Sequence, residues 1–470
     1  MTTENRRKEG KEAKTKESGR NPVSLSNSAM VDKVEREESI LPDNQRYTHI
    51  PTIQGVVSDY NIQEAIKAVT RNKGAPGIDG VTTEEIKGIL QKEWPKIKQD
   101  ILDGKYRPSP VKRVEIPKPD GSGIRKLGIP TVMDRVIQQA IYQELVYTFE
   151  ATFSENSYGF RLGRKAQQAV LKAQEYIQEG CEWVVDIDLE KFFDRVNHDI
   201  LMSRVARKVE DKEILLLIRR FLQAGVMENG LTKATEEGTP QGGPLSPLLS
   251  NIMLDDFDKE LEKRGHRFAR YADDCNIYVK SEKAGQRVMQ SVIKFLTTKL
   301  KLKVNEHKSA VAQPWDRKFL GFTFTSGKEP GRIAVHESRV KRLKDKIRDL
   351  TKRMRGSKVT DSIRKLIMPI TRGWVNYFDI AEARSIFASL DGWIRRKIRG
   401  ILWRQWKKPR TRYKQLIALG LKEHSAKRWA YSSKGPWRMA KTHGMHRAIS
   451  NSVIDSMGYI PMMTLVCKGS

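Results

Sequence analysis

The sequence predicts an α+β fold followed by a helical, strongly basic region, and three observations support this prediction. The chain has 470 residues, enough for roughly two to four domains with a sizeable buried core. Between residues 51 and 330, stretches with strand-like alternation and stretches with helical periodicity follow one another. After residue 331, apolar side chains recur at helical spacing among basic ones, as at Val340, Leu343, Ile347 and Leu350.

The composition indicates a protein that binds a polyanion in a reducing compartment. The chain carries 87 Lys and Arg against 57 Asp and Glu, a net charge of +30, and this excess points to nucleic acid. No apolar run approaches the roughly 18–20 residues that a membrane span needs. The three cysteines lie far apart, which argues against a disulfide framework or a CxxC zinc site. We therefore expect a cytoplasmic protein.

The positive charge is concentrated in the last 140 residues. Residues 331–470 hold 33 basic and 9 acidic side chains, so the charge cannot be neutralised within this region, and a nucleic-acid surface is expected. Six of the nine tryptophans lie there too, and we expect them to be mainly core residues. Residues 1–55 are polar, with too little apolar surface to offset chain entropy, and are expected to form a disordered arm.

Two adjacent carboxylates are predicted at the tip of a β-hairpin. Residues 267–280 fit a strand, a turn at Asp273 and Asp274, and a second strand in which apolar and more polar side chains alternate. Neighbouring carboxylates repel each other, which costs stability unless a cation is present. A divalent metal with oxygen ligands, Mg²⁺ in particular, suits this position.

A second acidic strand is predicted upstream of the hairpin. Asp186 and Asp188 lie two residues apart, so both side chains project from one face of the strand. Facing the hairpin, such carboxylates could hold two metal ions, an arrangement that supports in-line phosphoryl transfer. Residues 238–247, dense in glycine and proline, predict a tight loop that lets backbone approach a ligand. No P-loop sequence occurs.

Taken together, the motifs resemble those of the reverse transcriptase/maturase proteins encoded by group II introns, over roughly residues 56–460. The family's YxDD box has its counterpart at residues 271–274, its acid-plus-aromatic strand at 188–193 and its PQGxxLSP loop at 240–247. Further matching motifs are a fingers hairpin at 116–125, a following block at 157–161, closing palm motifs at 302–308 and 319–322, and a thumb/maturase signature at 372–378. Any one motif is weak evidence, but their shared order is specific.

The resemblance implies a right-hand polymerase with fingers, palm and thumb and with a helical basic maturase/thumb region. Asp188, Asp273 and Asp274 would be the catalytic residues and the ligands of two Mg²⁺ ions per active site. Asp188 is favoured over Asp186 because, in the family, an aromatic residue follows the catalytic acid by five positions, as Phe193 does here.

The resemblance also implies a set of nucleotide-binding residues. Phe193 would pack against the sugar of the incoming nucleotide and exclude a ribose hydroxyl, which selects dNTPs. Lys118 and Arg125 would contact the triphosphate, where they supply positive charge. Gln241 would lie near the sugar and the nascent base pair, and Lys308 would be a further phosphate contact.

The resemblance divides the chain into the arm at 1–55, fingers and palm at 56–330, a thumb/maturase domain at 331–410 and a basic RNA/DNA-binding segment at 411–470. It implies the short form of the family, without a C-terminal endonuclease domain. The expected function is RNA-directed DNA synthesis, with assistance to splicing of the intron RNA and to intron mobility by target-primed reverse transcription. The expected partners are intron RNA, an RNA template with a DNA primer, dNTPs and target DNA, in a cytoplasmic ribonucleoprotein.

Two other functions are compatible with the sequence. One is a splicing cofactor with a vestigial polymerase site, against which the complete set of acids, Phe193 and Gln241 argue. The other is a reverse transcriptase recruited to a cellular task such as DNA repair or phage defence, for which the unfamiliar N-terminal arm leaves room.

Overall fold

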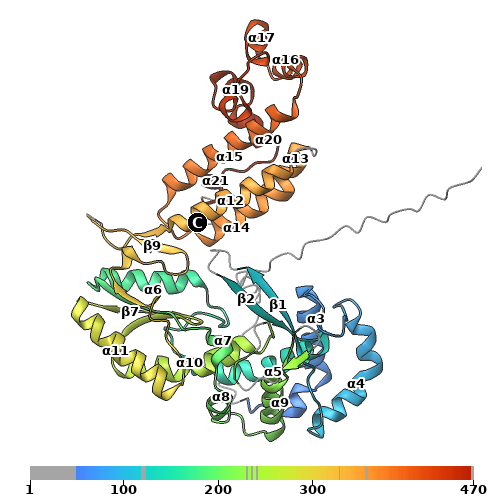
Figure 1. Cartoon of the computed structure of the whole chain (residues 1–470), viewed down its shortest axis with the longest axis vertical. Coiled ribbons are helices and arrows are strands. Elements are labelled where there is room, and N and C mark those ends of the chain that lie inside the picture. Colours follow the sequence, from blue (N-terminus) through green and yellow to red (C-terminus); the bar gives the residue numbers. More distant parts are fainter. Residues whose placement is uncertain are drawn as a thin grey trace, which may run out of the picture.

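The protein consists of an α/β lobe and an elongated helical lobe (Figure 1). The computed structural model describes residues 49–117, 123–228, 231–233, 237–239, 242–327, 329–354 and 358–466. Of the residues expected to bind nucleotide, Lys118 and Gln241 lie outside these ranges, as does nearly all of the expected N-terminal arm. The predicted α+β class is confirmed by the mixture of sheets and helices.

The first part of the α/β lobe is a helical group with a small sheet. The sheet has the strand order β2-β1-β4-β5, in which β1 and β2 form an antiparallel hairpin and β1 pairs with β4 in parallel. The buried helix α5 (Val132–Glu150) packs against α2 and α3. The elements of this part are α2 (Ile53–Val56), α3 (Asp59–Asn72), α4 (Ile86–Leu102), β1 (Val111–Pro117), β2 (Ile124–Ile129), α5, α8 (His198–Val205), α9 (Lys212–Gln223), β4 (Val226–Glu228) and β5 (Leu231–Lys233).

The second part is built on a four-stranded antiparallel sheet of order β6-β7-β3-β8. Side chains alternate across it: Val185 and Ile187 of β3 belong to the core shared with α10 and α11, whereas Val184 belongs to the core on the α6 side. The elements are α6 (Ala166–Gln178), β3 (Trp183–Ile187), α7 (Phe192–Arg195), α10 (Ser246–Lys263), β6 (Arg267–Tyr271), β7 (Asp274–Val279), α11 (Glu282–Lys299) and β8 (Ala310–Ala312). The predicted strand–turn–strand at 267–280 is confirmed.

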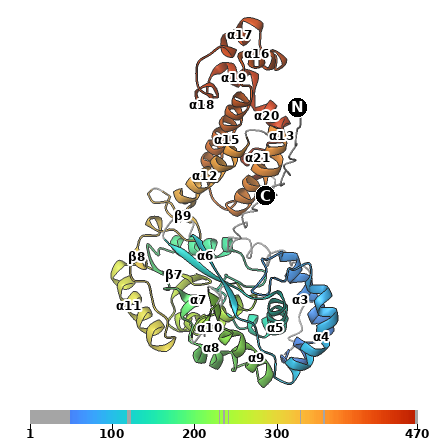
Figure 2. The same cartoon turned by 45° about the vertical axis from the view of Figure 1, so that its right-hand side comes forward.

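The helical lobe stands on the α6 side of the sheet, as Figures 1 and 2 both show. Its buried side chains form one continuous core with that face of the sheet. Two short strands and a 3₁₀ turn lie at the junction, and α18 and α21 fold back onto α15. The elements are η1 (Pro314–Asp316), β9 (Phe322–Phe324), β10 (Ile333–Val335), α12 (Glu337–Arg353), α13 (Val359–Ser362), η2 (Ile363–Ile367), α14 (Met368–Tyr377), α15 (Arg384–Gln405), α16 (Pro409–Ala418), α17 (Glu423–Ala430), α18 (Pro436–Met439), α19 (His443–Ala448), α20 (Asn451–Ser456) and α21 (Met462–Val466).

The tryptophans of the helical lobe serve mainly as core residues, as expected. Trp403 is fully buried, and Trp374, Trp393, Trp406 and Trp429 pack partly buried against the same core. Trp437 differs, because 41% of it is exposed. Within the ranges that the structure describes, none of the helices combines the length and the apolar character needed to cross a bilayer.

Candidate active site

The turn between β6 and β7 presents two neighbouring carboxylates. Tyr271 pairs with Asp274 across the hairpin, which leaves Ala272 and Asp273 as the turn residues. Burial raises the pKa of the Asp273 carboxyl, and the negative charge of Asp188 raises it further. The pKa of Asp274 is well above its usual value, first because of burial and then because of the charges of Asp186, Asp273 and Asp188. The turn is therefore a place where negative charge is crowded and poorly solvated.

The end of β3 supplies two further carboxylates, which have different partners. Arg317 donates from Nε and Nη2 to Oδ2 of Asp186, at 2.9 and 2.5 Å. Burial nevertheless raises the pKa of Asp186, although Arg317 counteracts the rise. The Asp188 side chain is 40% exposed, and Lys308 Nζ lies 3.9 Å from its Oδ2. Asp186 is thus engaged by an arginine, whereas Asp188 remains open toward the site.

These carboxylates fit divalent cations by their chemistry. Burial and the charge of Asp188 raise the pKa values of Asp186, Asp273 and Asp274, and a bound cation would offset the repulsion among these carboxylates. Within the described residues, no group of three or more His, Cys, Asp or Glu side chains is already gathered into a metal-holding cluster. The donor set thus has the charge and oxygen chemistry for metal, without a closed coordination shell.

Phe193 lies beside the described part of the glycine-rich loop. It is half-buried on α7, with its ring edge-on to Phe192 at a centroid distance of 5.2 Å. The backbone N–H of Thr239 donates to the Phe193 carbonyl at 2.6 Å. A Cβ at Gly238 would stand only 2.9 Å from the same carbonyl oxygen, so glycine permits this close approach. The loop predicted to approach a ligand does contact the aromatic residue of the site.

Two of the expected nucleotide-binding cations face the carboxylates. Arg125 is exposed on β2, and its charge acts to lower the pKa of Asp273, so it lies within electrostatic reach of the turn. Lys308 is 55% exposed next to Asp188. The structure brings Asp188, Asp273, Asp274, Arg125 and Lys308 to one region.

Sequence reasoning missed the arginine that holds Asp186. Arg317 comes from the segment after β8, 131 residues further along the chain. No local pattern distinguishes it among the many basic residues of this sequence. The sequence does show two acids, Asp186 and Asp188, where the family's motif needs only one. This extra carboxylate indicates that one of the two has a basic partner.

The chain matches two known families. Residues 116–324 match the family described as reverse transcriptase (RNA-dependent DNA polymerase), and residues 340–420 match the group II intron, maturase-specific domain. Protein YkfC of Escherichia coli is 33% identical over 303 residues, which are 56% of this chain and 78% of YkfC. The group II intron-encoded protein LtrA of Lactococcus lactis is 35% identical over 247 residues, 53% of this chain and 40% of LtrA. A COX1/OXI3 intron 1 protein of Saccharomyces cerevisiae is 30% identical over 264 residues, 54% of this chain and 30% of that protein.

Proposed function

The chain belongs to the family of group II intron reverse transcriptases with a maturase-specific domain, and we propose that its polymerase site is built on Asp188, Asp273 and Asp274. The observation that carries this proposal is the crowding of carboxylates at the β6–β7 turn, while Arg317 occupies Asp186. Family membership implies RNA-directed DNA polymerase activity and assistance to intron splicing. It also implies a divalent metal and binding of template and intron RNA.

The three aspartates would hold two Mg²⁺ ions, as the family's chemistry requires. When bound, such ions acidify the attacking primer hydroxyl and stabilise charge on the leaving oxygen. Asp188 is suited to this role because its carboxylate is 40% exposed and its ion pair with Lys308 is long, at 3.9 Å, whereas Arg317 binds the Asp186 carboxylate at 2.5 Å. Burial and, after it, the neighbouring carboxylates raise the pKa values of Asp273 and Asp274, and a cation would relieve the repulsion between these charges.

The nucleotide-binding residues would act around these aspartates. Arg125 and Lys308 bring positive charge to the region, where a triphosphate would carry its negative charge. Phe193, packed against the glycine-rich loop, would bar a ribose hydroxyl and so select dNTPs. Lys118 and Gln241 lie outside the described residues. By the resemblance, Lys118 would contact the triphosphate and Gln241 would lie near the sugar.

The helical lobe offers a surface suited to nucleic acid. Arg396 lies over the exposed ring of Trp437 at 3.8 Å from its centroid, and Lys397 lies between this ring and that of Trp393, at 4.8 and 5.5 Å. Arg348 covers Trp393 at 5.5 Å. Burial and the nearby cations, Arg348 first among them, lower the pKa of Lys397. We call these five residues the cation–tryptophan surface; crowded positive charge beside aromatic rings favours phosphates and bases.

The proposed activity operates in a ribonucleoprotein with intron RNA in the cytoplasm. The RNA template and the DNA primer would bind along the basic helical lobe mainly through phosphates, which give affinity with little sequence information. Target DNA would be engaged when the intron moves by target-primed reverse transcription. The expected domain limits remain 56–330 for fingers and palm, 331–410 for thumb/maturase and 411–470 for the basic C-terminal segment.

The polymerase proposal is tested by primer extension on an RNA template with Mg²⁺ and dNTPs. The wild type is compared with Asp273→Ala plus Asp274→Ala, and with a control that removes another adjacent aspartate pair, Asp255→Ala plus Asp256→Ala, on α10. We expect extension by the wild type and the control and none by the first variant. Wild-type protein that makes no cDNA yet binds structured RNA tightly would instead identify a splicing cofactor.

The RNA-binding proposal is tested by the salt dependence of affinity for intron RNA. The logarithm of the binding constant should fall with the logarithm of salt concentration, with a slope well beyond about −3. Replacing Arg396 and Lys397 by glutamine should make the slope shallower by roughly one to two. The matched pair Lys92→Gln and Lys96→Gln, exposed on α4, should leave it unchanged. A nearly flat dependence for the wild type would contradict the proposal.

A further inference from the structure

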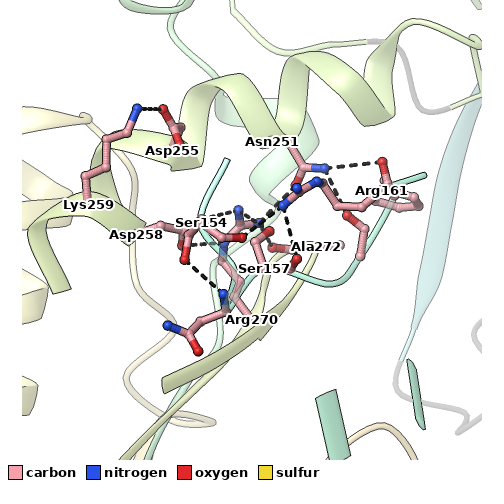
Figure 3. Close-up of polar contacts among 12 residues, drawn as sticks. Ser154, Ser157, Arg161, Asn251, Asp255, Asp258, Lys259, Arg270 and Ala272 are labelled. Atoms are coloured by element: carbon pink, nitrogen blue, oxygen red, sulfur yellow. Dashed lines mark hydrogen bonds and ion pairs between the residues drawn. The ribbon is translucent and has the colours of Figure 1, made fainter. Parts of the chain in front are cut away.

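The arginine two residues before Ala272, the first residue of the aspartate turn, is buried and fully hydrogen-bonded (Figure 3). Arg270 is the fourth residue of β6, and its side chain is 1% exposed. It forms a two-point ion pair with the fully buried Asp258 of α10, at 2.6 Å from Nε and 2.5 Å from Nη2. Its remaining N–H groups donate to Asn251 Oδ1, Ser157 Oγ and the carbonyl of Ala272. Every N–H of the guanidinium therefore has an acceptor.

The bond to the Ala272 carbonyl acts directly on the turn. Nη1 of Arg270 donates to this oxygen at 2.8 Å. Ala272 has a φ of +58°, in the left-handed region that residues other than glycine rarely adopt. Because a peptide group is planar, fixing the Ala272 carbonyl also fixes the N–H of Asp273 and the direction in which the Asp273 chain continues. The guanidinium thus holds a strained peptide whose orientation aims the catalytic carboxylate.

The same arginine ties the turn to the loop at residues 154–161. Asn251, which accepts from Arg270, donates from Nδ2 to the Gly159 carbonyl at 2.9 Å. Gly159 lies so close to the turn that an added Cβ would be 2.2 Å from the backbone nitrogen of Ala272. The backbone of Tyr158 also donates to the Arg270 carbonyl at 2.8 Å. Helix α10, this loop and the aspartate turn are therefore joined through one buried side chain.

We propose that Arg270, held by Asp258 and Asn251, is a positioning residue of the polymerase that sets the orientation of Asp273 through the Ala272 carbonyl. This inference rests on the proposed function, in which Asp273 is a metal ligand. Lysine could keep the charge opposite Asp258 but could not supply the planar fork of donors, because an ammonium group lacks that geometry. The bond to Ala272 should therefore be lost while the ion pair persists in part.

The experiment compares Arg270→Lys with Arg399→Lys, a matched control in the helical lobe. Arg399 is also buried and donates to a backbone carbonyl, that of Ile449, and to the side chain of Asn451. For each protein we would measure thermal unfolding, affinity for an RNA-template/DNA-primer duplex, single-nucleotide incorporation, and Mn²⁺ binding by electron paramagnetic resonance without dNTP. Both variants should lose thermal stability, and Arg270→Lys should lose more, because Arg270 also forms a buried ion pair with Asp258.

Only Arg270→Lys should change the chemistry of the site. Its incorporation rate at saturating dNTP should fall by roughly thirty-fold or more, since a misplacement of about 1 Å can cost a hundred-fold, while KM for dNTP and duplex affinity change little. Its Mn²⁺ affinity should fall by roughly five-fold or more, because fewer oxygens converge on the metal. Asn251→Ala keeps the ion pair between Arg270 and Asp258, so its losses of incorporation rate and Mn²⁺ affinity should be smaller. If Arg270→Lys does not fold, Asn251→Ala takes its place in the comparison.

Several results would overturn the inference. A loss of rate no larger than that of Arg399→Lys would show that Arg270 only stabilises the fold. A rise in KM with kcat unchanged would show that Arg270 contributes to substrate binding and does not position Asp273. If the wild type incorporates no nucleotide, the proposed polymerase function is wrong. In that case, Mn²⁺ binding alone tests whether Arg270 positions Asp273. Weaker Mn²⁺ binding by the variant would still support positioning of Asp273, and equal binding would refute it.

Discussion

Replacing Asp186 by asparagine should leave RNA-templated DNA synthesis largely intact, whereas the same replacement at Asp188 should abolish it. Asp186 lies on β3 and Asp188 directly follows its last residue, but only Asp186 accepts hydrogen bonds from Arg317. Asparagine at 186 keeps an oxygen that can accept from the guanidinium. Asparagine at 188 removes a negative charge that would face the metal ions.

The expected magnitudes follow from burial and partners. The Asp186 and Arg317 side chains are 14% and 29% exposed. Asp186→Asn replaces a charged hydrogen-bond acceptor by a neutral one, which should lower the free energy of unfolding by about 1–2 kcal/mol. A metal contributes several kcal/mol of transition-state stabilisation, and about 1.4 kcal/mol is tenfold in rate. Asp188→Asn should therefore slow incorporation by about a thousand-fold or more. Asp186→Asn should slow it by less than about tenfold.

The assay is single-turnover primer extension on an RNA template, combined with denaturant unfolding. Arg317→Met should destabilise the protein by about 3 kcal/mol, near the low end for breaking a buried ion pair because the guanidinium is partly exposed. Adding Asp186→Asn to this variant should restore much of the loss, since no buried charge is then left unpaired. Equal loss of activity in Asp186→Asn and Asp188→Asn would refute the reasoning.

Three further predictions concern backbone fit, pH and metal. Gly159→Ala should lower primer extension by roughly tenfold or more, because the added Cβ would stand 2.2 Å from the turn backbone. Gly88→Ala, whose Cβ would have nothing within 4 Å, should leave extension unchanged. Equal activities of the two variants would show that the turn tolerates displacement. Burial raises the pKa of Asp134 from 3.8 to about 6, so the folded state binds more protons than the unfolded state and loses stability as pH rises through this window. Relative to Asp134→Asn, the wild type should therefore lose about 2 kcal/mol between pH 4.5 and 7 in denaturant titrations, and a constant difference would contradict this. Mg²⁺ at about 100 times its Kd should stabilise the wild type by about 2.7 kcal/mol, seen as a higher Tm. It should not stabilise the variant Asp273→Asn plus Asp274→Asn. If Mg²⁺ raised the Tm of this variant as well, the metal would bind elsewhere.

Much of the site could be predicted from local sequence. The strand with acidic residues near 183–188 and the alternation of side chains at 275–279 are encoded in neighbouring residues, and the structure has β3 and β7 there. The helical spacing after residue 331 likewise corresponds to α12 and α15. Motif order identified Asp188, Asp273 and Asp274 as a set, and the structure brings them to one region.

Pairings across long stretches of chain could not be predicted in this way. The sequence supplied the acids on β3 but did not reveal that Arg317 holds Asp186, because 131 residues separate them. It showed an arginine before the turn but not its buried partner Asp258, which on α10 resembles one more charged helical residue.

The α+β class, the basic helical region and the acids at the hairpin turn follow from local sequence, because periods of two and 3.6 residues and turn chemistry act between near neighbours. The packing of distant elements, in contrast, pairs Asp186 closely with Arg317 and leaves Asp188 more exposed. It also brings Arg270 to the Ala272 carbonyl and folds α18 and α21 back onto α15. These contacts depend on how distant elements pack against one another. Because burial removes water, each buried charge needs the partner that the fold brings next to it.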